Sequence, residues 1–402
     1  MSNVSSSNSH KELKPKLRFN GFSDEWVENE LQNIFTKITQ KNTNGSISNV
    51  ICNSAQKGLI PQREYFDKDI ANSDNTDGYF VIKRGDFVYN PRKSVSAPYG
   101  PVSVYNYDND GIVSPLYLCF RPKEAINTSF YEWYFKSSAW HRYVYLYGDS
   151  GVRHDRVSIK DSTFFEMPLH IPCAAEQKKL SCFLALLDTN IQKQQQLVDS
   201  LKSYKRGLLS LVFNDKSPTH ILGDILKKGK AGGTPQSSNF SYYNGDIPFL
   251  SIADMTEQGK YIYCTEKHIS EAGLQNSTAW IVPADSLILS MYASYGLVSI
   301  NKVPLATSQA MFNMIFQQDI NVEYIYYFLT YLATTDYYTK MVSTGTQPNL
   351  NARSIPLFIP SQNEQKHIVK LLQTYDNRLT TEEKILTQLQ MSKAALLQQL
   401  FI

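Results

Sequence analysis

Two long stretches of the chain, 175–213 and 363–401, carry apolar residues at alternating spacings of four and three positions. This pattern is typical of a coiled-coil seam, in which a narrow apolar stripe packs against a partner helix. The predicted seam positions of the first stretch are Leu180, Leu184, Leu187, Ile191, Val198, Leu201 and Leu208. Those of the second stretch are Ile368, Leu372, Tyr375, Leu379, Leu386, Leu389 and Leu396. At ~1.5 Å per residue, a helix of about 38 residues is about 57 Å long.

The two stretches are parts of an internal repeat. The chain reads PLHIPCAAEQKKL from Pro168 and PLFIPSQNEQKHI from Pro356, 188 positions later. Segments 168–213 and 356–401 align without a gap over 46 positions, of which 14 are identical. A repeat of this kind predicts two similar structural halves with a pseudo-twofold relation.

Each copy has the features of a helix start. A proline precedes each helix, at Pro172 or Pro360. Glu176 or Glu364 falls in the first turn, where a carboxylate suits the positive end of the helix dipole. Polar residues interrupt the seam at matching places, Gln194 with Glu382 and Lys205 with Lys393. Such residues often fix the register of a coiled coil, and simple exposure to solvent is the alternative.

The order of elements predicts the direction of the helices. The first helix leads from one globular region to the next, and the second helix starts where the second region ends. If the two seams bury each other, the second helix must run back, and the pair is antiparallel with one region at each end. The alternative is two independent helices, each packed on its own domain. The length and narrowness of the seams favour the pair.

Mixed patterns precede each helix. In the first region, GYFVIKRGDFVYN (78–90) and GIVSPLYLCFRP (111–122) predict strands, and an aromatic stretch at 129–147 predicts a helix. The second region has the same order, with WIVPADSLILS (280–290), PLATSQAMFNMIF (304–316) and an aromatic stretch at 322–341. Most residues differ between the regions, which indicates a common scaffold with different surfaces.

The predicted fold class is therefore α+β, with two similar mixed α/β domains joined by two long antiparallel coiled-coil helices. The predicted segments are a disordered polar tail (1–15), a first domain (16–170), a first long helix (171–213), a second domain (214–358) and a second long helix (359–402).

Charge adds little to this picture. The net charge is +3, with 20 Lys+Arg against 19 Asp+Glu in residues 1–170 and 9 against 11 in residues 214–360. Binding of nucleic acid would therefore need local basic patches or charge from a partner.

The composition is that of a globular protein in a reducing compartment. No apolar run is long enough to span a bilayer, and the polar start MSNVSSSNSH has no apolar signal segment, so we expect a cytoplasmic protein without membrane contact. The five cysteines include no C-x-x-C pair, which makes a disulfide framework or zinc site improbable and predicts buried free thiols.

Motifs for catalysis are absent from the sequence. GKAGGTP has its lysine before the glycine pair and is not a phosphate loop, and YNPRK (89–93) lacks the second proline and the aromatic residue of an adenine methyltransferase motif. Glu-x-Lys occurs at 176–178, 364–366 and 382–384 on the predicted long helices, where solubility explains it. The seven histidines form no H-x-x-x-H pair. We therefore expect no catalytic residue and no metal site in this chain.

A resemblance to a known family becomes specific at this point. KLRFNGFSDEWVENELQNI (16–34), GKAGGTPQSSNFSYYNGDIPFLSIADM (229–255), the two IP…EQK helix starts and the repeat itself resemble the specificity subunit of a type I restriction-modification system. The resemblance extends over nearly the whole chain after the tail. Each motif alone is modest, and their order and spacing together are distinctive.

The resemblance implies a set of functions and partners. Two target recognition domains would each read one half of a split double-stranded DNA site. The antiparallel helices would serve as a ruler and as the docking site of two methyltransferase (modification) subunits, with motor-nuclease (restriction) subunits completing the complex. The chain itself would hold no cofactor, and S-adenosylmethionine, ATP and Mg would belong to the partner subunits.

Residue types then indicate where DNA would be touched. Arginine suits guanine, asparagine and glutamine suit adenine, and Lys, Ser and Thr hold phosphates. The predicted contacts of the first domain are Gln62, Arg63, Arg92, Lys93, Ser94, Tyr99, Arg153, His154 and Arg156. Those of the second domain are Lys227, Lys228, Lys230, Thr234, Tyr292, Ser294, Tyr295, Thr344, Gln347, Asn349, Asn351 and Arg353.

Structural roles are the alternative for some of these residues. Gly232 and Gly233, within the basic stretch of the second domain, could serve only to shape a turn. Arg153 and Arg156 flank Asp155 and could form internal ion pairs.

Other functions remain open from the sequence. A non-catalytic adaptor could bridge two proteins through its two domains, and the polar loops argue weakly against this. A DNA-cutting or DNA-modifying enzyme is disfavoured by the missing motifs. A specificity chain of a related split-site system, with methylase and nuclease fused, has the same sequence features as the type I subunit.

Overall fold

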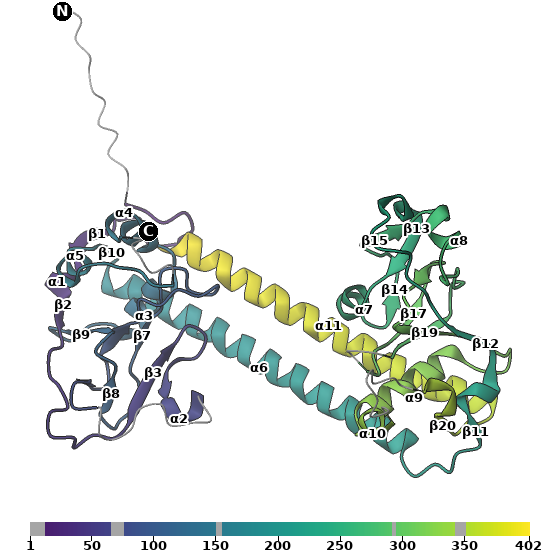
Figure 1. The fold of residues 1–402 in the computed structure, drawn as a ribbon. Helices are drawn as coiled ribbons and strands as arrows, with labels where there is room; N and C mark the ends of the chain where they lie inside the picture. Colours follow the sequence, from purple (N-terminus) through teal and green to yellow (C-terminus); the bar gives the residue numbers. More distant parts are fainter. Residues whose placement is uncertain (1–12, 66–75, 150–154, 292–294, 342–350) are drawn as a thin grey trace, which may run out of the picture. The chain divides into compact units, whose positions relative to one another are not determined.

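The computed structural model describes residues 13–65, 76–149, 155–291, 295–341 and 351–402. The chain forms two compact units (Figure 1). Unit 1 consists of the residues up to Lys193 together with Ile385–Ile402, and unit 2 consists of Gln194–Lys384. The tail prediction falls largely outside the described residues, and the predicted domain boundaries stay predictions.

Two long helices contribute to both units. Helix α6 spans Ala174–Phe213, and helix α11 spans Gln362–Leu400. The glutamates in their first turns have different partners despite the repeat. Ser361 and Glu364 form reciprocal hydrogen bonds at the start of α11, with Ser361 Oγ donating to Glu364 Oε2 at 2.7 Å. In unit 1, Glu176 is buried and accepts two 2.8 Å hydrogen bonds from Arg18.

Unit 1 contains a four-stranded antiparallel sheet in the order β2-β9-β6-β7. The strands are β2 (Phe35–Lys37), β6 (Phe87–Tyr89), β7 (Val102–Val104) and β9 (Leu118–Pro122). A second sheet has the order β4-β3-β8-β5, with β3 (Val50–Ser54), β4 (Gly58–Pro61), β5 (Phe80–Ile82) and β8 (Gly111–Val113). The short helices are α1 (Leu31–Ile34), α2 (Gln62–Tyr65), α3 (Thr128–Lys136), α4 (His141–Tyr147) and α5 (Asp161–Phe165).

Aromatic rings form the core of unit 1. Phe35 and Phe120 lie edge to face with ring centroids 5.2 Å apart, and Tyr131 of α3 lies 5.4 Å from Phe35. Such edge-to-face pairs stabilise a core beyond the area that they bury. Leu184 of α6 and Phe401 join the same cluster, so the start of α6 and the end of α11 pack in unit 1.

The predicted aromatic helix at 129–147 is two helices. Ser137 ends α3, and its hydroxyl donates to the Tyr134 carbonyl at 2.6 Å. Helix α4 then begins after Trp140.

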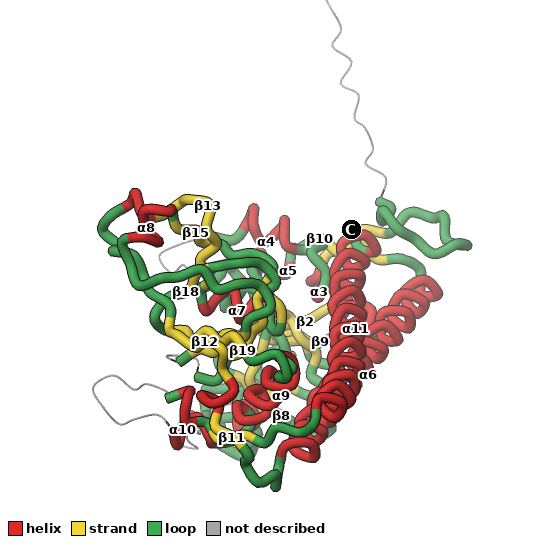
Figure 2. The backbone as a smooth tube through the Cα atoms, turned by 90° about the vertical axis from the view of Figure 1, so that its right-hand side faces the viewer, coloured by secondary structure: helices red, strands yellow, loops and turns green. Residues whose placement is uncertain are grey.

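Unit 2 contains a five-stranded sheet in the order β12-β19-β16-β17-β14. The strands are β12 (Leu226–Ala231), β14 (Tyr261–Ile262), β16 (Leu287–Ser290), β17 (Val298–Asn301) and β19 (Met311–Phe316). Figure 2 shows β12 beside β19. A second sheet, β15-β13-β18, consists of β13 (Tyr243–Leu250), β15 (Lys267–Ile269) and β18 (Ala306–Thr307). The helices are α7 (Ile252–Gln258), α8 (Glu271–Gln275), α9 (Val322–Ala333) and α10 (Tyr337–Met341), with 3-10 turns η2 (Leu222–Ile225), η3 (Phe240–Tyr242) and η4 (Ala352–Ser354).

The core of unit 2 surrounds α9. Asn321 caps this helix by accepting from the backbone N–H of Glu323 at 2.9 Å. Tyr324 and Leu329 of α9 are buried together with Phe213 of α6 and Leu372 of α11. The end of α6 and the start of α11 therefore pack in unit 2.

The sheets of both units follow one plan. The first strand of each main sheet pairs with the last (β2 with β9, β12 with β19), and the last pairs with an antiparallel hairpin (β6-β7, β16-β17). In each unit the second sheet contains one parallel pair, β3 with β8 and β13 with β18.

The repeated Pro-Leu motif forms the same junction in both units. Strand β10 (Pro168–Ile171) pairs antiparallel with β1 (Val27–Glu30), and β20 (Pro356–Leu357) pairs antiparallel with β11 (His220–Ile221). In each unit, an early strand thus pairs with the strand that directly precedes the long helix. The helix then begins in a matching way, because Gln177 donates to the Pro172 carbonyl and Gln365 to the Pro360 carbonyl, both at 3.0 Å.

The polar interruptions of the seam are paired between the helices. In unit 1, Lys393 of α11 forms an ion pair with Asp188 of α6. In unit 2, Lys205 Nζ lies 2.5 Å from Asp376 Oδ1, and Gln194 Nε2 donates to Glu382 Oε2 at 2.7 Å.

These pairs join the early part of one helix to the late part of the other, so α6 and α11 run antiparallel in each unit. They also exclude two independent helices. Lys205 and Lys393 are paired with a carboxylate of the other helix and are not simply exposed to solvent. All fourteen seam positions are buried or half-buried.

The described helices include none that is long and apolar enough to cross a membrane.

The prediction that the cysteines are buried is wrong for three residues, because Cys173, Cys182 and Cys264 are exposed. Cys119 is buried and Cys52 is half-buried. All five thiols are free. Cys182 lies on the solvent side of α6, two positions before the buried Leu184.

Candidate nucleic-acid interface

The predicted contact residues fall into two groups. Arg153, His154, Tyr292, Ser294, Thr344, Gln347 and Asn349 lie outside the described residues. The others lie on unit 1 or unit 2, and their DNA contacts stay predictions.

The central candidate of unit 1 is the loop between β6 and β7. At its base, the backbone N–H of Asn90 donates to the Pro101 carbonyl at 3.0 Å, and Asn90 Nδ2 donates to the Asn53 carbonyl at 3.1 Å. Gly100 has a positive φ of 82°, and a Cβ there would lie 2.1 Å from the Asn90 carbonyl oxygen. A glycine is therefore required, and the base of the loop has one defined conformation.

A second segment of unit 1 pairs with this loop. The backbone N–H of Lys93 donates to the Asp155 carbonyl at 2.8 Å, and that of Val157 donates to the Pro91 carbonyl at 2.9 Å. Arg92 and Arg156 thereby become antiparallel bridge partners. The predicted residues Arg92, Lys93 and Arg156 come together although they are distant in the sequence.

These three cations line a cavity of about 440 Å³. The other lining residues are neutral, namely Cys52, Asn53, Ser54, Ala55, Asn90, Pro91, Ser94, Pro101, Ser114, Leu116 and Tyr117. Burial raises the pKa of the Cys52 thiol and of the Tyr117 phenol, so neither carries a negative charge at pH 7. We call this recess the basic cavity.

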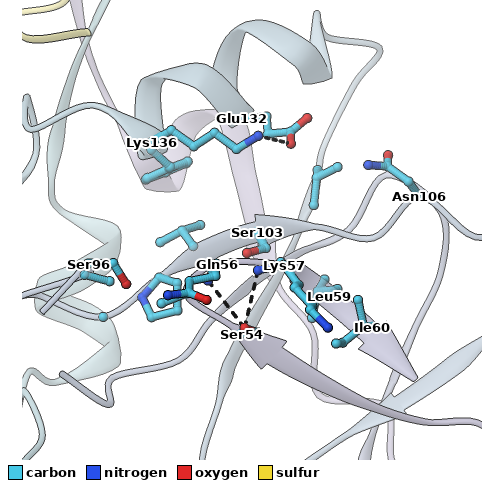
Figure 3. Close-up of a pocket in the computed structure, with 18 of the residues that line it drawn as sticks. Ser54, Gln56, Lys57, Leu59, Ile60, Ser96, Ser103, Asn106, Glu132 and Lys136 are labelled. Atoms are coloured by element: carbon cyan, nitrogen blue, oxygen red, sulfur yellow. Dashed lines mark hydrogen bonds and ion pairs between the residues drawn. The ribbon is translucent and has the colours of Figure 1, made fainter. Parts of the chain in front are cut away.

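A second cavity of unit 1, of about 540 Å³, borders the same loop (Figure 3). Ser96 and Ala97 of the loop line it together with the β3-β4 hairpin, α3 and α6. Its charges are balanced, because Lys57 and Lys136 face Glu132 and Asp188, and Lys136 Nζ lies 2.7 Å from Glu132 Oε1. The basic cavity is therefore the better match to a polyanion.

The remaining candidates of unit 1 have different surroundings. Gln62 is only 7% exposed in α2, so its amide is not open at the surface, whereas Arg63 is exposed. Tyr99 is half-buried with its ring 4.8 Å from the ring of His141.

The candidates of unit 2 gather along β12. Lys227, Lys228 and Lys230 are exposed, and Lys228 Nζ lies 3.9 Å from the centroid of the Trp280 ring. Arg353 donates to the Gly229 carbonyl, and its guanidinium lies 5.7 Å from the ring of Phe312. Part of the donor capacity of Arg353 is thus used within the fold.

Three further candidates of unit 2 are polar. Thr234 donates to Gln309 Oε1 at 2.5 Å, which places Gln309 beside the predicted contacts. Asn351 is exposed and Tyr295 half-buried. No local pattern pointed to Gln309 or Trp280, because both come from segments remote from β12.

Close packing explains the glycine pair of unit 2. A Cβ on Gly232 would lie 2.1 Å from the Thr307 carbonyl oxygen, and one on Gly233 would lie 2.2 Å from Thr278 Oγ1. Their backbone N–H groups donate to the carbonyls of Met311 and Thr307. Neither amide is open to a phosphate, and neither glycine has a positive φ, so close backbone contact is their role.

A half-buried polar network, which the sequence did not predict, connects the sheet of unit 2 to the long helices. Lys260 Nζ donates to Glu323 Oε2 and to Tyr327 OH, both at 2.9 Å. Tyr261 OH donates to Glu323 Oε1 at 2.6 Å, and Gln373 of α11 donates to the same carboxylate. The network continues from Tyr327 OH to Asp376 Oδ2 at 2.7 Å.

The pKa values of Glu323 and Lys260 in this network are both lowered. Burial alone would raise the pKa of Glu323, but the hydrogen bonds from Tyr261 and Lys260 outweigh it and lower the pKa. Burial also lowers the pKa of Lys260 and outweighs its attraction to Glu323. The two shifts are compatible, because Glu323 accepts from three donors while aromatic rings enclose Lys260.

The equivalent place in unit 1 is aromatic. Lys393 Nζ lies 5.0 Å from the centroid of the Trp133 ring, and Lys136 Nζ lies 4.4 Å from it. The described residues of both units contain no group of three His, Cys, Asp or Glu side chains that could hold a metal ion.

Comparison with known proteins places these surfaces in context. Residues 216–391 match the family model of the type I restriction modification DNA specificity domain. The chain is 28% identical over 158 residues to the type I restriction enzyme MjaIX specificity subunit of Methanocaldococcus jannaschii. It is 32% identical over 177 residues to the type I restriction enzyme HindI specificity subunit of Haemophilus influenzae.

These two matches cover 38% and 42% of this chain, and 36% and 37% of the relatives. The chain therefore matches little more than a third of the length of each curated relative. Together with the family model, the matches confirm the resemblance to type I specificity subunits that the sequence motifs indicated.

Solved structures confirm the predicted fold class. A chain from a structural study of complex assembly and conformational transition of the type I R-M system has a TM-score of 0.61 and 15% identity, covering 92% of this chain and 96% of that chain. The type I restriction-modification system S subunit from M. genitalium has a TM-score of 0.54 and 16% identity, covering 97% of this chain and 99% of that chain. At this identity, the likeness concerns the fold.

Proposed function

We propose that the whole chain is a DNA specificity subunit. The starting point is the match of residues 216–391 to the family model of the type I restriction modification DNA specificity domain. Each unit reads one half of a split double-stranded site. The chain performs no chemistry itself, and it directs methyltransferase and motor-nuclease subunits to the site.

The duplicated fold carries this proposal. Both units have the same sheet plan and the same strand junction, yet their candidate contact surfaces differ in residue type. A reader of two unlike half-sites needs this combination of one scaffold and two surfaces. A helix of ~57 Å exceeds one turn of duplex DNA, roughly 34–36 Å, so the helix pair is long enough to act as the ruler.

The long helices also support docking of the methyltransferase subunits. Large apolar side chains on them are strongly exposed, namely Leu186 (66%), Tyr204 (67%), Leu211 (79%) and Met391 (62%). Exposed apolar groups are typical of protein interfaces when they recur on one element. S-adenosylmethionine, ATP and Mg would act in the partner subunits.

A map of adenine methylation in the source cell, with and without the gene, tests the function. Loss of methylation at one split motif on deletion supports the proposal and identifies both half-sites and the spacer. An unchanged map in cells that express the partner methyltransferase contradicts it. Binding of the purified complex to random duplexes then separates DNA recognition from an adaptor role.

A further inference from the structure

The two bridged arginines of the basic cavity lack the close carboxylate partner that three other arginines of unit 1 have. Arg18, Arg84 and Arg121 each hold a carboxylate, at 2.8, 2.5 and 2.6 Å. The guanidinium of Arg92 has no hydrogen bond or ion pair with any residue that the structure describes. Arg156 Nε lies 4.0 Å from Asp155 Oδ2, and that carboxylate is 59% exposed.

This arrangement is unfavourable without a ligand. Like charges on directly opposed residues of a strand pair repel each other. Lys93 adds a third positive charge, and no carboxylate lines the cavity. The backbone hydrogen bonds on both sides of the bridge nevertheless hold Arg92 and Arg156 opposite each other. The site is therefore organised in advance for electronegative atoms.

Exposed apolar side chains beside the arginines favour a base edge over a phosphate. Val95 is fully exposed at the loop between β6 and β7, and Leu116, also on the rim of the cavity, is 59% exposed. A phosphate lies on the outside of the duplex and can be bound by a flat basic surface. A base edge lies on the floor of a groove and must be reached by a projecting element.

We propose that Arg92 and Arg156 read a guanine in the half-site of unit 1, through its O6 and N7 atoms in the major groove, with Lys93 on a neighbouring phosphate. This inference rests on the proposed function and deepens it. Arginine presents paired N–H donors that match the two acceptors of guanine, and no other base presents that pair of acceptors there.

Charge-conserving variants test the inference. Arg92→Lys and Arg156→Lys keep the positive charge and replace the rigid planar donor fork of the guanidinium with a single ammonium group. Neither arginine side chain supports the fold through a hydrogen bond. The full complex is assembled with each variant, and binding is measured on duplexes that vary every position of both half-sites. Each variant should lose about tenfold or more of its preference for one G·C pair in one half-site, with the other half-site unchanged.

Arg142→Lys is the matched control, because Arg142 is an exposed arginine of α4 in the same unit and does not line the basic cavity. It should retain every preference. A duplex with 7-deazaguanine at the affected position provides an independent readout. It should weaken binding by the original complex and cause a smaller loss with the double variant Arg92→Lys/Arg156→Lys.

Three results overturn the inference. One is a unit 1 half-site without a G·C pair, and another is full retention of base preference in both lysine variants. The third is a uniform loss of affinity with an unchanged motif, which assigns the arginines to phosphates. If the original complex has no base preference at all, the proposed function fails instead, so the two failures are distinguishable.

Discussion

Units 1 and 2 attach to the long helices through equivalent residues but different chemistry. Asp188 pairs with Lys393 in unit 1, and Lys205 pairs with Asp376 in unit 2. These residues occupy identical positions of the repeat, with the roles of the two helices exchanged. Beyond the ion pairs the units diverge, since Lys393 packs on the Trp133 ring and Asp376 enters the network of Tyr327, Lys260 and Glu323.

The comparison separates what the repeat keeps from what it varies. The cross-helix ion pair and the strand junction are kept, and both serve the register of the helix pair. The attachment of each domain varies, as do the candidate DNA contacts. The basic residues among these candidates are mainly arginines in unit 1 and mainly lysines in unit 2. A duplicated reader retains its geometry in this way while its two surfaces change independently.

Lengthening the helix pair should have the largest effect. Four residues are inserted between Asp188 and Gln194 and four between Glu382 and Lys393, so that both ion pairs stay intact. Each helix gains about 6 Å, close to two base pairs of duplex. The methylated motif should then keep both half-sites and gain about two base pairs of spacer, as measured by methylation mapping. An unchanged spacer in a folded variant refutes the ruler.

Removal of Glu323 should cause the next largest effect, confined to unit 2. Glu323→Ala leaves Lys260, Tyr261 and Gln373 without their shared acceptor, which should destabilise the unit by roughly 3 kcal/mol. Amide hydrogen exchange of α9 measures the loss. The exposed Glu257, on α7 of the same unit, supplies the control Glu257→Ala, which should change exchange little. Equal effects of both substitutions would contradict a structural network.

The same substitution at equivalent positions should have unequal effects. Lys205→Met removes the charge that faces Asp376 Oδ1, an oxygen that receives no hydrogen bond, and should cost about 2 kcal/mol. Lys393→Met leaves the half-buried Asp188 and keeps an apolar contact with Trp133, so about 1 kcal/mol is expected. Hydrogen exchange of each unit measures the two losses of stability. A larger loss of stability in unit 1 than in unit 2 would contradict the prediction.

Local patterns were sufficient to predict the scaffold. The four-three spacing and the prolines predicted α6 and α11, and the identical Asp and Lys positions of the repeat became the cross-helix pairs. The candidate site was harder, because it depends on contacts between distant segments. Nothing local shows that Arg92 lies opposite Arg156, or that Gln62 of a polar stretch is buried.

Some features had no signal of their own. The network of unit 2 joins Lys260 to Glu323, 63 positions later, and neither residue is part of a recognisable motif. Gly232 and Gly233 resemble a turn in the sequence, although backbone atoms packed against them require their small size. The half-site sequences do not follow from the chain, because the docking angle of a loop decides which base its side chains meet.

Acid should weaken unit 2 more than unit 1, and this is the smallest effect expected. The folded-state pKa of Glu323 is lowered, so its stabilisation is complete above the unfolded-state pKa of about 4.3 and is lost as the pH falls through the folded-state value. Hydrogen exchange of α9 should therefore rise relative to α3 as the pH is lowered from about 5 to 3, after correction for intrinsic rates. Glu323→Gln removes this titration and should flatten the difference. A difference that persists in Glu323→Gln would assign the acid sensitivity to another carboxylate of unit 2.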